Sequence, residues 1–237
     1  MFVNASVDIC RALKTEGYVL VQAKDLDLDE EAGESFKSLS AEWQDLPPDL
    51  YLKDQEPYRR RRFGSYRYST ASDELTALKH EPFYQSAEYN KFAGGISRHF
   101  QPLTPQGYGN AFLKELIKFN VMKLRIEDGH SEEWKVGVHQ IRIISNSRFV
   151  GNPTPEGIHR DGVAYFSVHL IARENIGRGG VTCIYTPGGG KINELTLSNP
   201  LDSLYANDRS ILHCVSEIHP ADGAEFAFRD ALIMTYE

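Results

Sequence analysis

The stretch GNPTPEGIHRDGVAYFSVHLI, residues 151–171, joins a loop, a motif and a strand. Gly and Pro punctuate residues 151–157, whereas residues 164–171 form a run of aromatic, β-branched and apolar side chains typical of a strand. The motif His159-Arg160-Asp161 lies between them. Residues i and i+2 of an extended segment share a face, so His159 and Asp161 are expected to point the same way.

Similar short runs surround this stretch, separated by Gly, Pro, Asn or Asp. We predict strands over residues 136–144, 164–171, 181–185, 203–204 with their neighbours, 211–215 and 231–236. Strands at this spacing are typical of a sandwich or barrel. Upstream, the apolar periodicity predicts helices over residues 5–13 and 111–127, the second capped by Asn110, and a strand over residues 18–21.

The expected architecture is mainly β with flanking helices, in one domain over residues 1–237. Residues 1–57 are expected to form a helical N-terminal support, and the β core is expected to begin near residue 136. The length of 237 residues is ample for one such domain.

Charge and composition narrow the function classes. The chain has 26 basic and 33 acidic residues, so its net charge of −7 disfavours a general nucleic-acid coat. The cluster Arg59 to Arg62 keeps RNA contact as a minority alternative. The sequence has no signal-peptide pattern and no apolar run near the roughly 18 residues of a membrane span. Three cysteines without C-x-x-C spacing favour a reducing cytoplasm.

A second histidine, His213, completes a candidate metal site with His159 and Asp161. Two imidazoles and one carboxylate form the facial set that holds non-haem Fe(II) and leaves positions open, while the absence of thiolate disfavours structural zinc. Two alternatives stay open. His213 alone could be a core histidine, and His130-Ser131-Glu132 is a rival motif in a polar turn.

Arg229 follows His213 within Ala227-Phe228-Arg229-Asp230. A guanidinium buried in a β core needs an anionic partner. A dicarboxylate that chelates iron at one end offers such a partner at the other. The alternative is that Arg229 pairs with Asp230 or Glu225 at the surface.

The order of several motifs resembles the bacterial Fe(II)/2-oxoglutarate dioxygenases of the L-isoleucine hydroxylase type, together with the biofilm-stress-motility protein A group. The resemblance covers roughly residues 58 to 236. The matching stretches are Arg61 to Tyr66, Tyr84 to Asn90 with Gly94-Gly95, His139 to Arg142, His159 to Asp161, Val168 to Leu170, Ile176 to Gly180, Leu212-His213 and Ala227 to Asp230.

The resemblance implies a double-stranded β-helix, also called a jelly roll, that uses Fe(II), 2-oxoglutarate and O2. It implies that His159, Asp161 and His213 bind iron and that Arg229 binds the distal carboxylate of 2-oxoglutarate. Where many relatives have Ser or Thr two residues after the arginine, this chain has Ala231, so Thr182 or Thr235 would supply a hydroxyl. Asp161 favours hydroxylation over halogenation, because halogenases of this superfamily lack the carboxylate ligand.

The implied substrate is a small molecule, a free L-amino acid. Arg62, Tyr66 and Arg142 are the expected substrate-binding residues, with Arg98 as a further candidate, whereas Arg59 and Arg60 are expected to face solvent. The alternative function is a non-catalytic metal-binding barrel that acts as a binding or stress-signalling module. Homo-oligomer formation stays open, and neither a membrane nor a nucleic acid is the expected partner.

Overall fold

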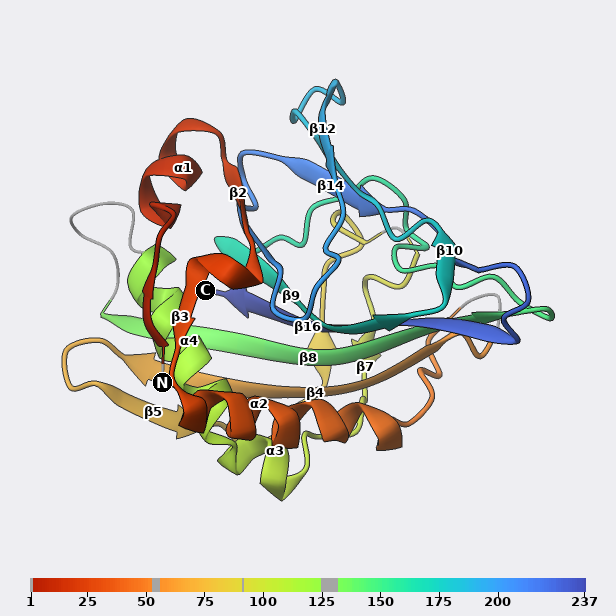
Figure 1. Cartoon of the computed structure of the whole chain (residues 1–237). Helices are drawn as coiled ribbons and strands as arrows, with labels where there is room; N and C mark the ends of the chain where they lie inside the picture. Colours follow the sequence, from red (N-terminus) through yellow and green to blue (C-terminus); the bar gives the residue numbers. More distant parts are fainter. Residues whose placement is uncertain (1, 53–55, 91, 125–131) are drawn as a thin grey trace.

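The computed structural model describes residues 2–52, 56–90, 92–124 and 132–237. Its largest element is an antiparallel sheet of seven strands in the order β2-β13-β9-β16-β8-β4-β5 (Figure 1). These strands are β2 Tyr18–Val21, β13 Ser203–Asn207, β9 Tyr165–Glu174, β16 Phe226–Tyr236, β8 Glu133–Asn146, β4 Arg59–Ser69 and β5 Glu74–Ala77.

A smaller sheet faces one side of this main sheet (Figure 1). Its order is β12-β11-β14, with bounds Lys191–Leu195, Thr182–Tyr185 and Leu212–Val215. Within the described chain the two sheets keep separate edges and do not close into a barrel. Short pairs complete the β structure: β1 Phe2–Ala5 with β3 Leu26–Leu28, β6 Phe83–Tyr84 with β7 Ser97–Arg98, and β10 Ile176–Arg178 with β15 His219–Pro220.

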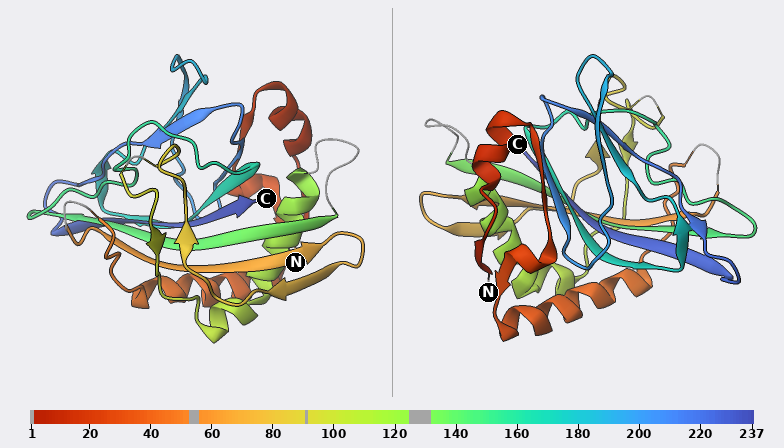
Figure 2. Two further views of the ribbon diagram at one scale, coloured as in Figure 1. Left: turned by 180° about the vertical axis from the view of Figure 1, so that it is seen from behind. Right: turned by 45° about the horizontal axis from the view of Figure 1, so that its top comes forward.

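Helices cover the opposite face of the main sheet. They are α1 Ile9–Thr15, α2 Glu30–Ala41, α3 Pro105–Gly109 and α4 Ala111–Leu124, with 3-10 turns at Ala23–Asp25 and Glu42–Asp45. The view from behind in Figure 2 shows β4 and β8 between helices α2 and α3 below and the smaller sheet above. The buried cluster on the helical side includes Trp43, Leu113, Leu116, Val136 and Met234. A second buried cluster, which includes Phe166, Leu204 and Ile184, lies on the side of the smaller sheet, so the main sheet is buried on both faces.

The expected helices are present with shifted starts and ends. α1 begins at Ile9 because the Asp8 side chain caps it by accepting a hydrogen bond from the Arg11 backbone N–H. Asn110 caps α4 as predicted, accepting from the Leu113 N–H at 3.0 Å. α4 is described to Leu124, and the predicted residues 125–127 lie outside the described part of the chain.

The six expected C-terminal strands correspond to β8, β9, β11, β13, β14 and β16. The N-terminal half contributes more to the main sheet than the sequence suggested. β2 pairs with β13, and β4 pairs with β8 over its whole length. Residues 1–57 therefore supply a strand of the sheet as well as helices. Pairing with these segments satisfies backbone N–H and C=O groups that would otherwise stay unpaired at a free strand edge.

Strand register decides which side chains face the smaller sheet. On β8, the side chains of His139, Ile141 and Ile143 point between the sheets, whereas Gln140 and Arg142 point to the other face.

The rival metal motif falls partly outside the described residues, since His130 is not among them. Among the helices described, none combines the length and apolar character needed to cross a membrane.

Candidate metal and cosubstrate site

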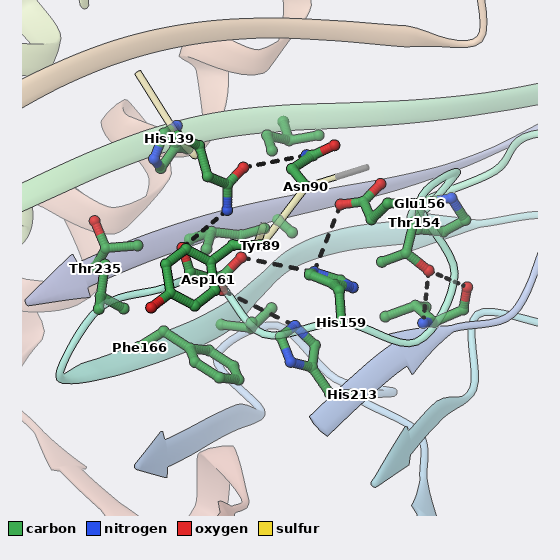
Figure 3. Close-up of a pocket in the computed structure, with 18 of the residues that line it drawn as sticks. Tyr89, Asn90, His139, Thr154, Glu156, His159, Asp161, Phe166, His213 and Thr235 are labelled. Carbon is green, nitrogen blue, oxygen red and sulfur yellow. Dashed lines mark hydrogen bonds and ion pairs between the residues drawn. The ribbon is translucent and has the colours of Figure 1, made fainter. Parts of the chain in front are cut away.

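A cavity of about 350 Å³ lies between the two sheets and contains the predicted metal ligands (Figure 3). Its floor consists of alternate residues on the central strands of the main sheet. The smaller sheet contributes Thr182, His213 and Val215 from above. Because the side chains of facing strands converge here, residues far apart in the sequence meet in one enclosed space.

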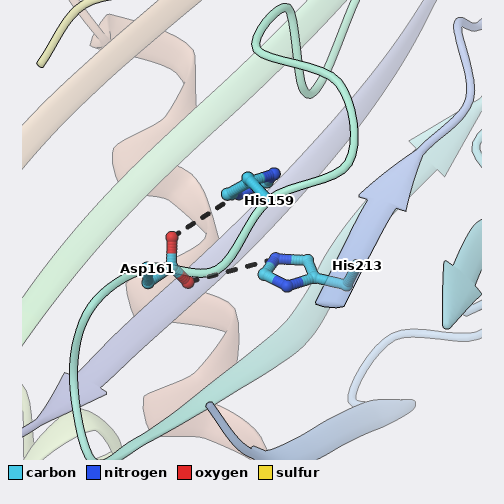
Figure 4. Close-up of side chains that lie close together, drawn as sticks. All are labelled: His159, Asp161 and His213. Atoms are coloured by element: carbon cyan, nitrogen blue, oxygen red, sulfur yellow. Dashed lines mark ion pairs between the residues drawn. The ribbon is translucent and has the colours of Figure 1, made fainter. Parts of the chain in front are cut away.

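His159, Asp161 and His213 form one cluster inside this cavity (Figure 4). Their candidate ligand atoms all lie within 4.8 Å of one another. The two carboxylate oxygens of Asp161 face different rings, at 3.6 Å from His159 Nε2 and 4.0 Å from His213 Nε2. Three converging N and O donors at such distances can surround one divalent metal ion.

Backbone pairing fixes the two histidines relative to each other. Residues 159 and 213 form an isolated antiparallel bridge, with N–H to carbonyl distances of 3.0 and 2.9 Å. Their ring centroids are 4.4 Å apart, and the His213 ring also packs 4.5 Å from Phe166. His159 Nδ1 donates to the Gly157 carbonyl at 2.9 Å. That hydrogen bond leaves Nε2, which faces Asp161, available for a metal.

The turn that carries Asp161 is held by Asp208. The Asp208 carboxylate accepts backbone N–H groups from Asp161, Gly162 and Val163 at 2.7–3.1 Å. Gly162 has φ +83°, and a Cβ there would lie 2.4 Å from the Tyr89 ring. The turn therefore requires glycine both for its backbone conformation and for the close approach of Tyr89.

Charges within the cluster shift its pKa values in opposite directions. Burial alone would lower the pKa of His159, but Asp161 and Glu156 raise it to about 9. Burial, reinforced by His159, lowers the pKa of His213 to about 3. Burial alone would raise the pKa of Asp161, but the nearby histidines hold it below its usual value. Asp161 is therefore an ionised carboxylate beside a protonated His159 and a neutral His213, and a divalent metal ion bound by all three would displace the His159 proton.

Arg229 lines the same cavity and is only 4% exposed. Burial lowers its pKa to about 10, so the guanidinium stays charged at neutral pH. Its neighbour Asp230 points to the other face of β16, where its carboxylate receives two hydrogen bonds from Arg142, at 2.7 and 2.6 Å. Arg229 Nε has no hydrogen-bond partner among the described residues. The surface-pair alternative for Arg229 therefore does not describe this site.

The two predicted hydroxyl donors also line the cavity. Thr182 is buried on β11, and Thr235 lies on β16 with Ala231 and Arg229 on the same face. Thr182, Thr235 and Arg229 thus face one enclosed space, in which hydroxyl and guanidinium groups can bind a carboxylate.

The expected substrate residues Arg62, Tyr66 and Arg142 lie elsewhere, which corrects the prediction. Arg62 donates to the Pro102 and Asp45 carbonyls, Tyr66 donates to the Tyr108 carbonyl, and Arg142 pairs with Asp230. The physical reason is register. Arg62 pairs with Gln140 and Tyr66 with Val136, so both belong to the face covered by helices.

The arginines that do face the cavity are Arg59, Arg61 and Arg98. Arg59 had been expected at the surface, yet it pairs with Ile143 and shares its inward face. Arg60, the next residue along β4, is exposed, as predicted. Alternation along β4 could have separated Arg59 and Arg61 from Arg60 and Arg62. Only pairing with β8 shows which set points inward.

Sequence reasoning missed three further residues around the site. Gln85 donates to the Asp161 carbonyl at 2.9 Å, Glu156 lies 3.5 Å from His159 Nε2, and Asp208 holds the turn. Gln85 lay inside a matching stretch, but nothing in its residue type indicated a contact 76 positions away. His139, which lies within one of the matching stretches, also lines the cavity.

Comparison with known proteins agrees with this geometry. Residues 40–235 match the family model described as 2OG-Fe dioxygenase. The chain is 26% identical over 195 residues to an L-isoleucine-4-hydroxylase from Bacillus thuringiensis, covering 79% of this chain and 80% of that protein.

Solved structures confirm the jelly-roll fold. A bsmA homologue from Methylobium petroleophilum PM1 matches with a TM-score of 0.85 and 30% identity, covering 99% of this chain and 93% of that one. IDO from Bacillus thuringiensis matches with a TM-score of 0.82 and 18% identity, covering 97% of each chain. The cavity, its His-Asp-His cluster and the family match over most of the chain lead to one conclusion: this protein belongs to the 2OG-Fe dioxygenase family, whose members use Fe(II), 2-oxoglutarate and O2.

Proposed function

We propose that this enzyme hydroxylates a small substrate, a free L-amino acid, with His159, Asp161 and His213 as the iron ligands. Arg229, assisted by Thr182, binds the distal carboxylate of 2-oxoglutarate. The observation that carries the proposal is that the clustered ligand atoms face the same cavity as Arg229, whose Nε has no hydrogen-bond partner among the described residues.

The donor chemistry fits the group. Two imidazoles and one carboxylate leave Fe(II) with a charge of +1, which attracts an anionic cosubstrate. The Asp161 carboxylate takes the position that a halide would need, so the residues favour hydroxylation. When bound, iron with 2-oxoglutarate supplies the activation of O2 that C–H hydroxylation requires, and the protein orients the substrate and excludes water.

An amino-acid substrate is supported by the cavity and by the relative. The space of about 350 Å³ suits a small molecule, and its wall carries both guanidinium and carboxylate groups. The Bacillus thuringiensis relative is named for L-isoleucine. A reducing cytoplasm, in which Fe(II) persists, would suit this chemistry.

The test is a panel of the twenty L-amino acids incubated with enzyme, Fe(II), 2-oxoglutarate and O2. The proposal expects at least one to give succinate together with a product heavier by one oxygen atom, and His159→Ala to abolish both. Succinate formation that no amino acid stimulates, with no oxidised product, would contradict the assignment of the substrate.

A further inference from the structure

Arg98 is a buried cation that the proposed iron and 2-oxoglutarate sites do not use. It is 2% exposed and lines the cavity. Nη2 donates to Gln85 Oε1 at 3.2 Å, while Nε has no hydrogen-bond partner among the described residues. The ion pairs between described residues include none to Arg98. A buried guanidinium with only an amide partner is costly unless an anion binds beside it.

Arg61 adds to the positive charge on the same wall. Asp49 is the carboxylate that forms an ion pair with Arg61, and it is already engaged by Arg59, whose Nε donates to it at 2.7 Å. Arg61 Nη1 lies 3.8 Å from Asp49, and Arg61 Nη2 is hydrogen-bonded to His139 Nδ1 at 2.6 Å. Burial and the nearby Arg61 lower the pKa of His139 well below its usual value, so its ring is a neutral acceptor. Asp49 thus serves two arginines, and among the described residues no carboxylate forms an ion pair with Arg98.

Aromatic rings hold both guanidinium groups in place. The Arg61 guanidinium carbon lies 3.8 Å from the Phe100 ring centroid, and that of Arg98 lies 4.8 Å from the Phe83 centroid. Stacking of this kind orients the planar fork and excludes water from its faces. The remaining N–H groups are therefore preorganised for a planar, two-oxygen acceptor such as a carboxylate.

Glu156 places a negative charge at the same cavity. It lines the cavity wall. Its charge acts to raise the pKa values of Arg61 and Arg98, but burial has the larger effect and lowers both. Its nearest described partner is His159, at 3.5 Å, rather than either arginine. Figure 3 shows Glu156 beside His159. The cavity thus offers cationic and anionic groups that do not neutralise each other directly.

The two anion sites are separate. Arg61 on β4 pairs with Ile141 of β8, and Arg229 on β16 pairs with Ile143 of β8 from the opposite side, so two strand spacings, roughly 10 Å, lie between β4 and β16. Arg98 comes from β7, outside the main sheet. One site can hold 2-oxoglutarate while the other holds a second carboxylate.

We infer that Arg98 and Arg61 bind the α-carboxylate of the substrate and that Glu156 accepts its α-ammonium group. The inference rests on the proposed function and deepens it. It restricts the substrate to a zwitterion with a free carboxyl and a free amino group, and excludes an internal residue of a peptide.

Binding to the Mn(II)- and 2-oxoglutarate-loaded protein, measured by calorimetry without turnover, tests this inference. The probes are the twenty L-amino acids, their carboxamides and their N-acetyl derivatives. The variants are Arg98→Met and Arg98→Lys, with Arg67→Met as control, because Arg67 is exposed on the same strand as Arg61. Circular dichroism and the melting temperature check that each variant folds.

The inference expects an amino acid to bind the wild type at least tenfold more tightly than its carboxamide. Arg98→Met should weaken binding of that amino acid about 50-fold and leave the carboxamide within threefold. The affinity of Arg98→Lys for the amino acid should lie between those of the wild type and Arg98→Met, and the affinity of Arg67→Met should match that of the wild type. Glu156→Gln should weaken binding of the amino acid about tenfold and change binding of its N-acetyl derivative little.

Two results would overturn the inference. The first is that no amino acid binds the wild type, and the second is that Arg98→Met weakens binding of 2-oxoglutarate but leaves binding of the amino acid unchanged. Binding with the expected pattern but no oxidised product in the turnover panel would refute the proposed function and leave this carboxylate site standing.

Discussion

The side-chain amide of Gln85 donates a 2.9 Å hydrogen bond to the backbone carbonyl of Asp161. The other end of the same amide accepts from Arg98 and from Asn90. One buried side chain thus joins the loop after β6, the proposed carboxylate site and the turn that carries a proposed metal ligand. A contact of this kind orients a ligand without touching the metal.

We expect Gln85→Met to weaken Fe(II) binding by about 10- to 100-fold, because the Asp161 turn loses a donor that fixes it. Anaerobic metal titration measures the effect, and Gln106→Met serves as control because Gln106 is exposed on α3. Unchanged affinity in Gln85→Met would show that the turn is rigid without this bond.

Asp208→Ala removes a carboxylate that accepts three backbone N–H groups of the Asp161 turn. Leaving such donors buried and unpaired costs about 1–3 kcal/mol of stability. Urea unfolding should show this loss, and metal titration should show weaker binding. Asp222→Ala, at an exposed position, should change neither. Equal stability of Asp208→Ala and wild type would mean that other groups or water satisfy the turn.

Arg229→Met should raise the dissociation constant of 2-oxoglutarate about 100-fold and leave Fe(II) affinity within threefold. The reason is loss of a charge-assisted, bidentate contact to a carboxylate. Arg229→Lys should recover part of the affinity, since it restores charge but not the fork. Arg178→Met, an exposed substitution on β10, is the control. A loss of iron binding with intact 2-oxoglutarate binding would contradict the assigned role.

Asp49 predicts a pH dependence of stability. Burial alone would raise its pKa, but Arg59 and Arg61 hold the pKa below its ordinary value in the folded protein. Because the pKa of Asp49 is lower in the folded protein than in the unfolded chain, its ionised carboxylate stabilises the fold. This stabilisation is fully present above the pKa of the unfolded chain, about 4, and is lost as the pH falls through the pKa of the folded protein. Asp49→Asn should therefore reduce the free energy of unfolding by roughly 3 kcal/mol at pH 7.

The deficit of Asp49→Asn should begin to shrink when urea unfolding is repeated at pH 3.5, because the carboxyl of the unfolded wild-type chain, with a pKa of about 4, then takes up a proton that the folded carboxyl does not. Asp27→Asn, at an exposed position, should show little deficit at either pH. A deficit for Asp49→Asn that is constant across this range would mean that lost packing, rather than lost charge, destabilises the variant.

Sequence patterns predicted the strands that carry the site because each has a marked local signal. His159, Asp161, His213 and Arg229 sit on or beside such strands, so their convergence followed from strand order and the family resemblance. The register of β4 could not be read in the same way. Both faces of β4 are buried, since Phe63 contacts the His139 ring and Tyr66 packs under the helices, so polar and apolar residues do not alternate cleanly.

Loop contacts were beyond prediction for a different reason. Gln85, Glu156 and Asp208 act through hydrogen bonds or charge at positions where loops from distant parts of the chain meet. No local periodicity encodes such contacts, because they depend on how loops pack once the sheets are in place. Arg98 likewise lies on a two-residue strand, too short to leave a pattern.

The most direct test of the central claim follows oxygen from O2 into the product. The enzyme is incubated with Fe(II), 2-oxoglutarate, ¹⁸O2 and the amino acid that binds best, and the products are analysed by mass spectrometry. The proposed function predicts one ¹⁸O atom in the hydroxylated amino acid and one in succinate, formed in equal amounts, with neither product in Asp161→Ala. Succinate without a labelled amino acid, or a product unchanged in Asp161→Ala, would contradict it.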